Sequence, residues 1–317
     1  MKRLLLTIGA AAVAAMCQAG VKYWDNPDFK AFDVGDYAAG AVWNYDGIRN
    51  SGADAAHDNS AATWVNLGMS GSANDLTKRS VGTGGDGFWA SDGYVFNGGT
   101  RWYGGASVSV SGSWTVQMLV DASLSAQTCD DAPVASVMID HFAFLLNKTN
   151  DRFYARLNNK STFPQFSIAS VPTDYATVIL DNEALTATAF PGTTPPTSGD
   201  GFKTFASAIG SKSTTGYGLG STSTDGQQFV GTLKSFRWYQ RVLTPEELAW
   251  NRVVDEARFF GRTAPLPVTN AVVATSVAGL SGNEPPGTYA VDAEGHVFTA
   301  PRVARLNGAK YLCSGYT

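Results

Sequence analysis

Charged residues are scarce in this chain of 317 residues. Asp, Glu, Lys and Arg together make up 16% of the sequence, and the formal net charge is −4. Soluble domains usually carry about a quarter of charged residues. No cluster of basic residues is interleaved with aromatic residues, which is the pattern that a nucleic-acid-binding surface requires. We therefore expect no nucleic-acid partner.

Cysteine and histidine are equally rare, with three of each. Cys129 and Cys313 are too few and too far apart to form a disulfide framework, and the sequence leaves open whether they pair. The motifs H-E-x-x-H and G-x-S-x-G are both absent. Gly82–Gly87 matches the letters G-x-G-x-x-G, but it lacks the preceding buried strand and the following helix that dinucleotide binding needs. We interpret it as a glycine-rich loop.

Long hydrophobic runs are absent except at the start of the chain. Lys2 and Arg3 precede the apolar run Leu4–Met16, and Ala19 supplies a small residue at its exit. This run is too short to span a membrane, and its flanks are those of a secretory signal peptide. We expect residues 1–19 to be a signal peptide, the protein to be secreted or displayed at the cell surface, and no transmembrane segment to be present.

What the chain has in abundance is glycine, aromatic residues and short alternating segments. Ser113–Ala122 alternates over most of its length, and Tyr175–Leu180 with Leu185–Phe190 resembles a hairpin. Polar stretches at Gly192–Asp200 and Ser211–Asp225 are predicted to be loops. Many short strands separated by turns indicate a β-sandwich or a jelly roll. Further predicted strands are Val134–Asp140, Phe142–Asn147, Asp151–Leu157 and Phe166–Val171.

One segment, Phe229–Gly261, combines a strand with a helix. Phe229–Arg241 mixes aromatic and charged residues, as a half-buried strand does. Thr244 and Glu247 are then predicted to form a capping box, because the Thr hydroxyl and the Glu carboxylate can each accept a backbone N–H at the helix start. Pro245 suits the first helical position, where its missing N–H is not needed. Helical spacing of apolar residues follows, and Gly261 provides a left-handed stop.

This same segment carries a family resemblance. The sequence G-T-L-K-S-F-R-W-Y-Q-R-V-L-T-P-E-E-L is similar to the closing strand and helix of LamG-like jelly-roll domains in the concanavalin A-like lectin/glucanase superfamily. Trp43–Thr77 is similar to the opening segment of secreted bacterial members. The resemblance implies an all-β, two-sheet jelly-roll sandwich over residues 20–262, with one short C-terminal helix. The matching positions of the closing segment are Gly231, Leu233, Phe236, Arg237, Tyr239, Arg241, Leu243, Thr244, Glu247 and Leu248.

The sequence changes character after Gly261. Prolines mark Arg262–Pro267 as a linker. Residues 263–317 are then expected to form a small, incomplete β module, in which Gly287–Val291 and His296–Thr299 pair as a hairpin.

Retaining glucanases place their carboxylates on one strand as E-x-D-x-x-E or E-x-D-x-E, about 5–5.5 Å apart. None of the six glutamates here has an Asp two residues later. We therefore expect no enzyme activity. The leading function is non-catalytic binding or adhesion to a glycan or another extracellular polymer. A structural packing module of a cell-surface protein is the alternative, and a glycoside hydrolase-like enzyme is a distant third.

Two sets of residues are candidates for binding. Arg101, Trp102 and Tyr103 are predicted to bind carbohydrate, with Trp102 and Tyr103 exposed and able to stack on a sugar ring. The alternative is that one of the two rings points into the core, as strand alternation requires. Calcium is the cofactor that the family suggests, with loop residues Asp46, Asp58 and Asp225 as its candidate ligands. Their alternative role is to form turns.

Overall fold

The computed structural model describes residues 32–81, 84–137, 142–158, 162–168, 175–221 and 227–261, together with the backbone of short strands nearer the two termini. Two compact units result. Phe32–Phe260 forms one, and Met1–Ala31 with Gly261–Thr317 forms the other.

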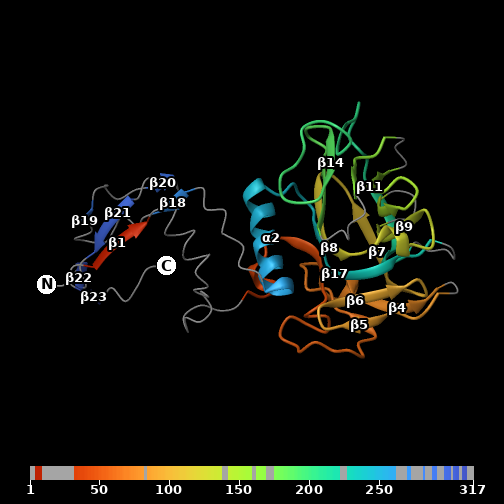
Figure 1. Ribbon diagram of the computed structural model, residues 1–317, viewed down its shortest axis with the longest axis horizontal. Coiled ribbons are helices and arrows are strands. Elements are labelled where there is room, and N and C mark those ends of the chain that lie inside the picture. Colours follow the sequence, from red (N-terminus) through yellow and green to blue (C-terminus); the bar gives the residue numbers. More distant parts are fainter. Residues whose placement is uncertain are drawn as a thin grey trace. The chain divides into compact units, whose positions relative to one another are not determined.

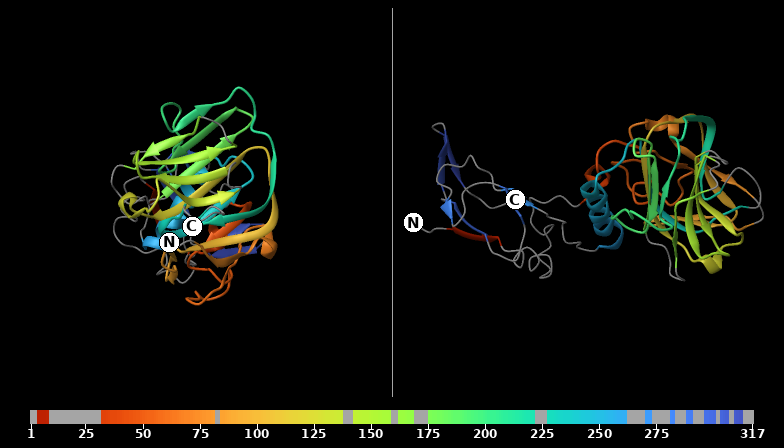
Figure 2. Two further views of the ribbon diagram at one scale, coloured as in Figure 1. Left: turned by 90° about the vertical axis from the view of Figure 1, so that its right-hand side faces the viewer. Right: turned by 90° about the horizontal axis from the view of Figure 1, so that it is seen from above.

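The larger unit is a sandwich of two antiparallel sheets, as predicted (Figures 1 and 2). One sheet, called the β11 sheet here, has the order β12-β11-β10-β9-β16-β7-β4-β3. Its strands are β12 (Gln165–Ser167), β11 (Arg152–Leu157), β10 (Phe142–Asn147), β9 (Asp131–Val137), β16 (Lys212–Leu219), β7 (Thr100–Val110), β4 (Leu76–Ser80) and β3 (Thr63–Trp64).

The other sheet, called the β17 sheet, has the order β15-β14-β13-β8-β17-β6-β5, and β2 pairs with β17 as well. Its strands are β15 (Phe202–Thr204), β14 (Thr186–Phe190), β13 (Tyr175–Asp181), β8 (Trp114–Asp121), β17 (Val230–Tyr239), β6 (Gly93–Asn97), β5 (Phe88–Ala90) and β2 (Ala41–Asp46). Because β17 bonds to β8 on one side and to β6 and β2 on the other, the segment predicted as a half-buried strand lies at the centre of the sheet.

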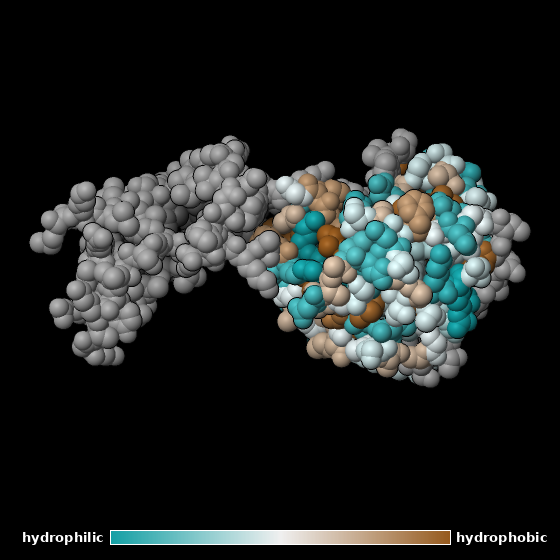
Figure 3. Space-filling view, turned by 90° about the horizontal axis from the view of Figure 1, so that it is seen from below, coloured by the Kyte–Doolittle hydropathy of each residue, from teal (hydrophilic) through white to brown (hydrophobic). Residues whose placement is uncertain are grey.

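The core between the sheets is aromatic. Trp43, Trp64, Trp89, Trp114 and Trp238 are all buried there. The rings of Trp114 and Trp238 lie 4.7 Å apart, at a distance typical of aromatic pairs. Trp250 is only half-buried. On the face seen from below, hydrophilic and hydrophobic residues alternate in small patches (Figure 3).

Helix α2 (Pro245–Phe260) follows β17 directly. Its capping box is confirmed: the Thr244 N–H donates to Glu247 Oε2 at 3.0 Å, and the Glu247 N–H donates to Thr244 Oγ1 at 3.3 Å. Gly261, with φ of 57°, ends the helix in the left-handed region. No helix in the described part of the chain is long and apolar enough to cross a membrane.

Some predicted elements are wrong. Ser211–Asp225 was expected as a loop, yet Lys212–Leu219 is strand β16. The Ser, Thr and Gly residues of this segment are typical of loops, but Tyr217 and Leu219 alternate with them and face the core. Of Phe166–Val171, only Phe166 and Ser167 lie in a strand, β12, and residues 169–171 lie outside the described residues.

In the smaller unit, the expected hairpin is wrong as well. There β20 (Thr288–Ala290) pairs with β18 (Asn270–Val272), whereas β21 (His296–Ala300) pairs with β1 (Leu4–Ile8) and β19 (Ser281–Gly282). The last pair is β22 (Val303–Leu306) with β23 (Ala309–Leu312).

Candidate functional site

The outer face of the β17 sheet is covered in part by α2. Leu248 of the helix packs with Tyr239 of β17 and Ile179 of β13, and Phe259 packs with Leu119 of β8. A polar contact also holds the helix on the sheet, since Asn251 Nδ2 donates to Gln117 Oε1 at 2.6 Å. The center of this face is therefore used for packing, and it offers little space for a ligand.

The outer face of the β11 sheet carries a different set of side chains. In β10, Phe142, Phe144 and Leu146 belong to the core, so the residues between them point outward. The strand register then places Asp131, Asn147, Arg152 and Ser167 in one row across four strands. The next row is Pro133, Leu145, Tyr154 and Gln165.

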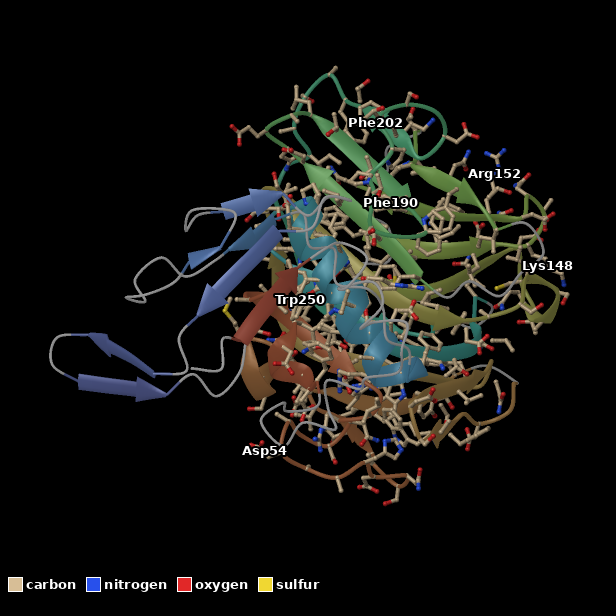
Figure 4. All side chains as sticks on the ribbon, turned by 60° about the vertical axis from the view of Figure 1, so that its left-hand side comes forward. Asp54, Lys148, Arg152, Phe190, Phe202 and Trp250 are labelled. Carbon is tan, nitrogen blue, oxygen red and sulfur yellow. The ribbon has the colours of Figure 1, made fainter. Side chains whose placement is uncertain are left out.

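Five residues of these two rows, with Asn150 and Phe163, line a pocket of about 440 Å³. Its walls come from the β9, β10, β11 and β12 strands, from the β10–β11 turn and from the segment before β12. Arg152, at its rim, lies with Lys148 at the edge of the sandwich farthest from α2 in the view of Figure 4. The described lining residues are Asp131, Asn147, Asn150, Arg152, Tyr154, Phe163 and Gln165.

Two aromatic rings form the apolar part of the pocket. The ring centroids of Tyr154 and Phe163 lie 5.6 Å apart at an interplanar angle of 35°. Tyr154 is buried at 9% exposure, while Phe163 is half-buried and packs against Ala143, Leu145 and Tyr154. Burial and a hydrogen bond to Asp131 raise the pKa of the Tyr154 hydroxyl above its usual range, so this group stays protonated and donates to the Asp131 carboxylate.

The polar part of the pocket is held by its own contacts. Asn147 Nδ2 donates to Asp131 Oδ1 at 2.7 Å, and its Oδ1 accepts from Asn150 Nδ2 at 2.9 Å. Arg156 approaches Asp131 Oδ2 at 3.7 Å. Arg152 pairs at 3.2 Å with Asp200, where both side chains are substantially exposed. The pocket thus combines aromatic rings with hydrogen-bond donors and acceptors whose positions are fixed by their own contacts.

The predicted carbohydrate-binding residues are arranged differently from the expectation. Trp102 is fully buried in the core, so the prediction that both rings are exposed is wrong. The reason is alternation in β7, which turns Trp102 inward and its neighbours Arg101 and Tyr103 outward. The guanidinium carbons of Arg79 and Arg101 lie 4.0 and 4.8 Å from the centroid of the Tyr103 ring. Ring and cations pair with each other there, and a binding role for Arg101 and Tyr103 stays a prediction.

Asp46 and Asp58, two of the three predicted calcium ligands, each accept hydrogen bonds from neighbouring groups of the fold. Asp46 is buried, and it accepts from Arg258 at 2.5 and 3.0 Å and from the Ile48 and Arg49 N–H groups. Asp58 accepts from the N–H and hydroxyl of Ser60, each at 2.7 Å, which is a turn-forming arrangement. Asp225 lies outside the described residues. Within the described residues, no three His, Cys, Asp or Glu side chains are grouped so as to hold a metal ion.

The structure describes one of the two cysteines whose pairing the sequence left open. Cys129 is a free, half-buried thiol, whereas Cys313 lies outside the described residues. Sequence reasoning missed every residue of the pocket. The available signal was the segment Arg152–Leu157, where Arg152, Tyr154 and Arg156 alternate with apolar residues and so mark a polar and aromatic outer face.

No family model matches the sequence, and no curated protein matches it. Solved structures share its general architecture. A Trypanosoma rangeli sialidase in complex with 2,3-difluorosialic acid has 12% identity and a TM-score of 0.45, over 78% of this chain and 38% of the sialidase. Domain 4 of AbnA, a GH43 extracellular arabinanase from Geobacillus stearothermophilus, in complex with arabinotriose, has 15% identity and a TM-score of 0.46, over 68% of this chain and 98% of that domain. The Ruminococcus gnavus IT-sialidase CBM40 bound to α2,3-sialyllactose has 16% identity and a TM-score of 0.33, over 44% of this chain and 82% of that chain.

Proposed function

We propose that the protein is a non-catalytic carbohydrate-binding module of the LamG-like kind and that it binds its glycan in the pocket on the β11 sheet. The observation that carries this proposal is the lining of the pocket. Two aromatic rings lie beside one carboxylate, three side-chain amides and one guanidinium. A ligand that suits this lining has apolar faces and several hydroxyl groups.

A sugar has both. The C–H groups on one face of a pyranose or furanose ring pack against an aromatic ring, while its hydroxyl groups both donate and accept hydrogen bonds. Asp131 and the amide oxygens can accept from hydroxyls, and Arg152 and the amide nitrogens can donate. The pocket volume of about 440 Å³ lies within the range of small-molecule sites.

The proposal is for binding without catalysis. Most retaining and inverting glycoside hydrolases use two carboxyl groups that flank the scissile bond. Asp131 is the one carboxylate among the described lining residues. Export to the cell surface or medium is part of the same proposal, and it rests on the apolar run that follows Lys2 and Arg3.

The test is a glycan array and a polysaccharide-binding assay with the full chain and a Phe163→Ala variant. Removing the ring should weaken binding by about tenfold, which is the change that about 1.4 kcal/mol of lost contact produces. Phe88→Ala is the matched control, because Phe88 is an exposed aromatic residue on β5, in the other sheet. It should bind as the unaltered protein does.

Two results would contradict the proposal. If no glycan on the array binds, the protein is better described as a structural packing module. If Phe163→Ala and Phe88→Ala bind a glycan equally well, the glycan is held elsewhere. Release of reducing sugar from a bound polysaccharide would contradict the non-catalytic part alone.

A further inference from the structure

Two arginines face each other on the outer side of the β11 sheet. Arg79 of β4 lies directly across from Arg101 of β7 in the strand register, so both side chains are on one face of the sheet. That face is the outer one, because Trp102, the next residue of β7, is buried in the core. None of the described residues that line the pocket lies on β4 or β7, so the two arginines are a separate feature.

This arrangement places like charges side by side. Like charges directly opposite each other in an antiparallel pair are destabilising. Arg79 is exposed, and within the described part of the chain it forms no ion pair with an Asp or Glu. Arg49 and Arg152, by contrast, each pair with a carboxylate. The charge of Arg79 is therefore balanced by no described carboxylate, and the neighbouring Arg101 adds to it.

The ring of Tyr103 holds the two guanidinium groups in place. Their carbons lie 4.0 Å (Arg79) and 4.8 Å (Arg101) from the ring centroid, within the range of cation–π contacts. Gly216 of β16 makes room for the ring, because a Cβ atom there would overlap the Tyr103 side chain. The register between β16 and β7 shifts at Gly216, whose φ of 103° favours glycine. The two cations are thus positioned before a ligand arrives, which lowers the entropic cost of binding.

The chemistry of these cations selects an anion. A guanidinium group can contact a ring with its face while the N–H groups in its plane bind an oxyanion through parallel hydrogen bonds. An anion close to both Arg79 and Arg101 also offsets their mutual repulsion. A neutral sugar brings no such gain, and it would have to displace a cation from the Tyr103 ring in order to stack there.

We propose that Arg79 and Arg101, positioned by Tyr103, bind a sulfate ester or carboxylate group of an acidic polysaccharide. An ion pair on an exposed sheet face is weak, so a single free anion would bind poorly. A polymer that repeats the anionic group presents it at a high local concentration. The choice of a polysaccharide rests on the proposed function, whereas the anionic group follows from the two arginines.

The experiment measures binding of the full chain to dextran, dextran sulfate and carboxymethyl dextran, three polymers with one backbone. At least one anionic dextran should bind more tightly than dextran, and its affinity should fall as salt rises, because salt screens exposed charges. Arg79→Gln should weaken this binding about fivefold, and Arg79→Gln/Arg101→Gln by more than about tenfold. Preference for dextran sulfate assigns the site to sulfate esters, and preference for carboxymethyl dextran assigns it to carboxylates.

Lys203→Gln is the matched control, because it removes one positive charge from β15, in the other sheet. It should bind the anionic dextrans as the unaltered protein does, and the unfolding temperature of each variant shows whether it is folded. Phe163→Ala should also bind them normally, even where it has lost a glycan from the pocket, so the two proposals fail separately. The inference is overturned if neither anionic dextran binds more tightly than dextran, or if folded Arg79→Gln binds them as Lys203→Gln does.

Discussion

Arg237 and Asp255 form a bidentate ion pair in which neither side chain is exposed to solvent. The pair joins the central strand β17 to helix α2, and Tyr37 completes it by donating from its hydroxyl to Asp255 Oδ1 at 2.8 Å. The Tyr37 ring also lies against the Arg237 guanidinium, at 4.0 Å from its carbon to the ring centroid. Arg237 is thus both a conspicuous position of the family resemblance and the point where the helix is fixed to the sheet.

We expect Asp255→Ala to lower the free energy of unfolding by about 3–5 kcal/mol, because it leaves the Arg237 charge buried without its partner. Asp200→Ala removes an exposed ion pair with Arg152 and should cost about 0–1 kcal/mol. Urea unfolding of the full chain measures both. The double variant Arg237→Met/Asp255→Leu should recover much of the loss. Equal stabilities of Asp255→Ala and Asp200→Ala would contradict this expectation.

The start of α2 should make stability depend on pH. Hydrogen bonds from Arg241 hold the pKa of Glu247 below its usual value, and the Thr244 N–H adds to this effect against partial burial. A carboxyl whose pKa is lower in the folded state stabilises the fold above its unfolded pKa, and this contribution is lost as the pH falls through the folded value. The stability of the unaltered protein should therefore fall as the pH drops below about 4.5.

Glu247→Gln isolates that contribution. It should be less stable than the unaltered protein at pH 7, and the difference should shrink toward zero in acid, as measured by urea unfolding at a series of pH values. Glu246→Gln is the control on the same helical turn. A stability difference between Glu247→Gln and the unaltered protein that stays constant from neutral to acidic pH would be inconsistent with this role.

The helix and its cap could be predicted because their signals are local. Thr244 and Glu247 are three residues apart, and the two hydrogen bonds they make are fixed by the geometry of one helical turn. Strand β8 and the β13–β14 hairpin are local in the same sense. Ser113–Ala122 was expected and Trp114–Asp121 forms the strand, while Thr177–Asp181 pairs with Thr186–Phe190 through a short turn.

The pocket could not be predicted because it depends on register between distant strands. Asp131, Asn147 and Arg152 share a row only because β9 has an irregularity opposite Phe144 and Leu145, which shifts the pairing by one residue. No short motif records such a shift. The exposure of Trp102 and Tyr103 could not be predicted for a related reason. Alternation shows that the two rings face opposite sides of the sheet, but the sequence alone does not say which side is the core.

The Tyr103 ring should contribute little to binding a neutral glycan. The guanidinium groups of Arg79 and Arg101 already lie against it, so a sugar would have to displace a cation–π contact to stack there. We expect Tyr103→Ala to change the affinity for a neutral polysaccharide by less than about twofold, against about tenfold for Phe163→Ala. Titration calorimetry with a glycan found on the array makes the comparison. A tenfold loss in Tyr103→Ala would instead assign the glycan to the outer face of β7.

Calcium should have no effect through Asp46. Both oxygens of this buried carboxylate accept hydrogen bonds from Arg258, which is nearly buried itself, so a calcium ion would have to displace that guanidinium. We expect any change that calcium makes in the unfolding temperature to be the same for the unaltered protein and for Asp46→Asn. Asp46→Asn should lower the free energy of unfolding in both conditions, because it removes the nearer of the two carboxylates that pair with Arg258 and leaves Asp33 Oδ1 at 3.7 Å. If calcium raised the unfolding temperature of the unaltered protein but not that of Asp46→Asn, the carboxylate would be a metal ligand after all.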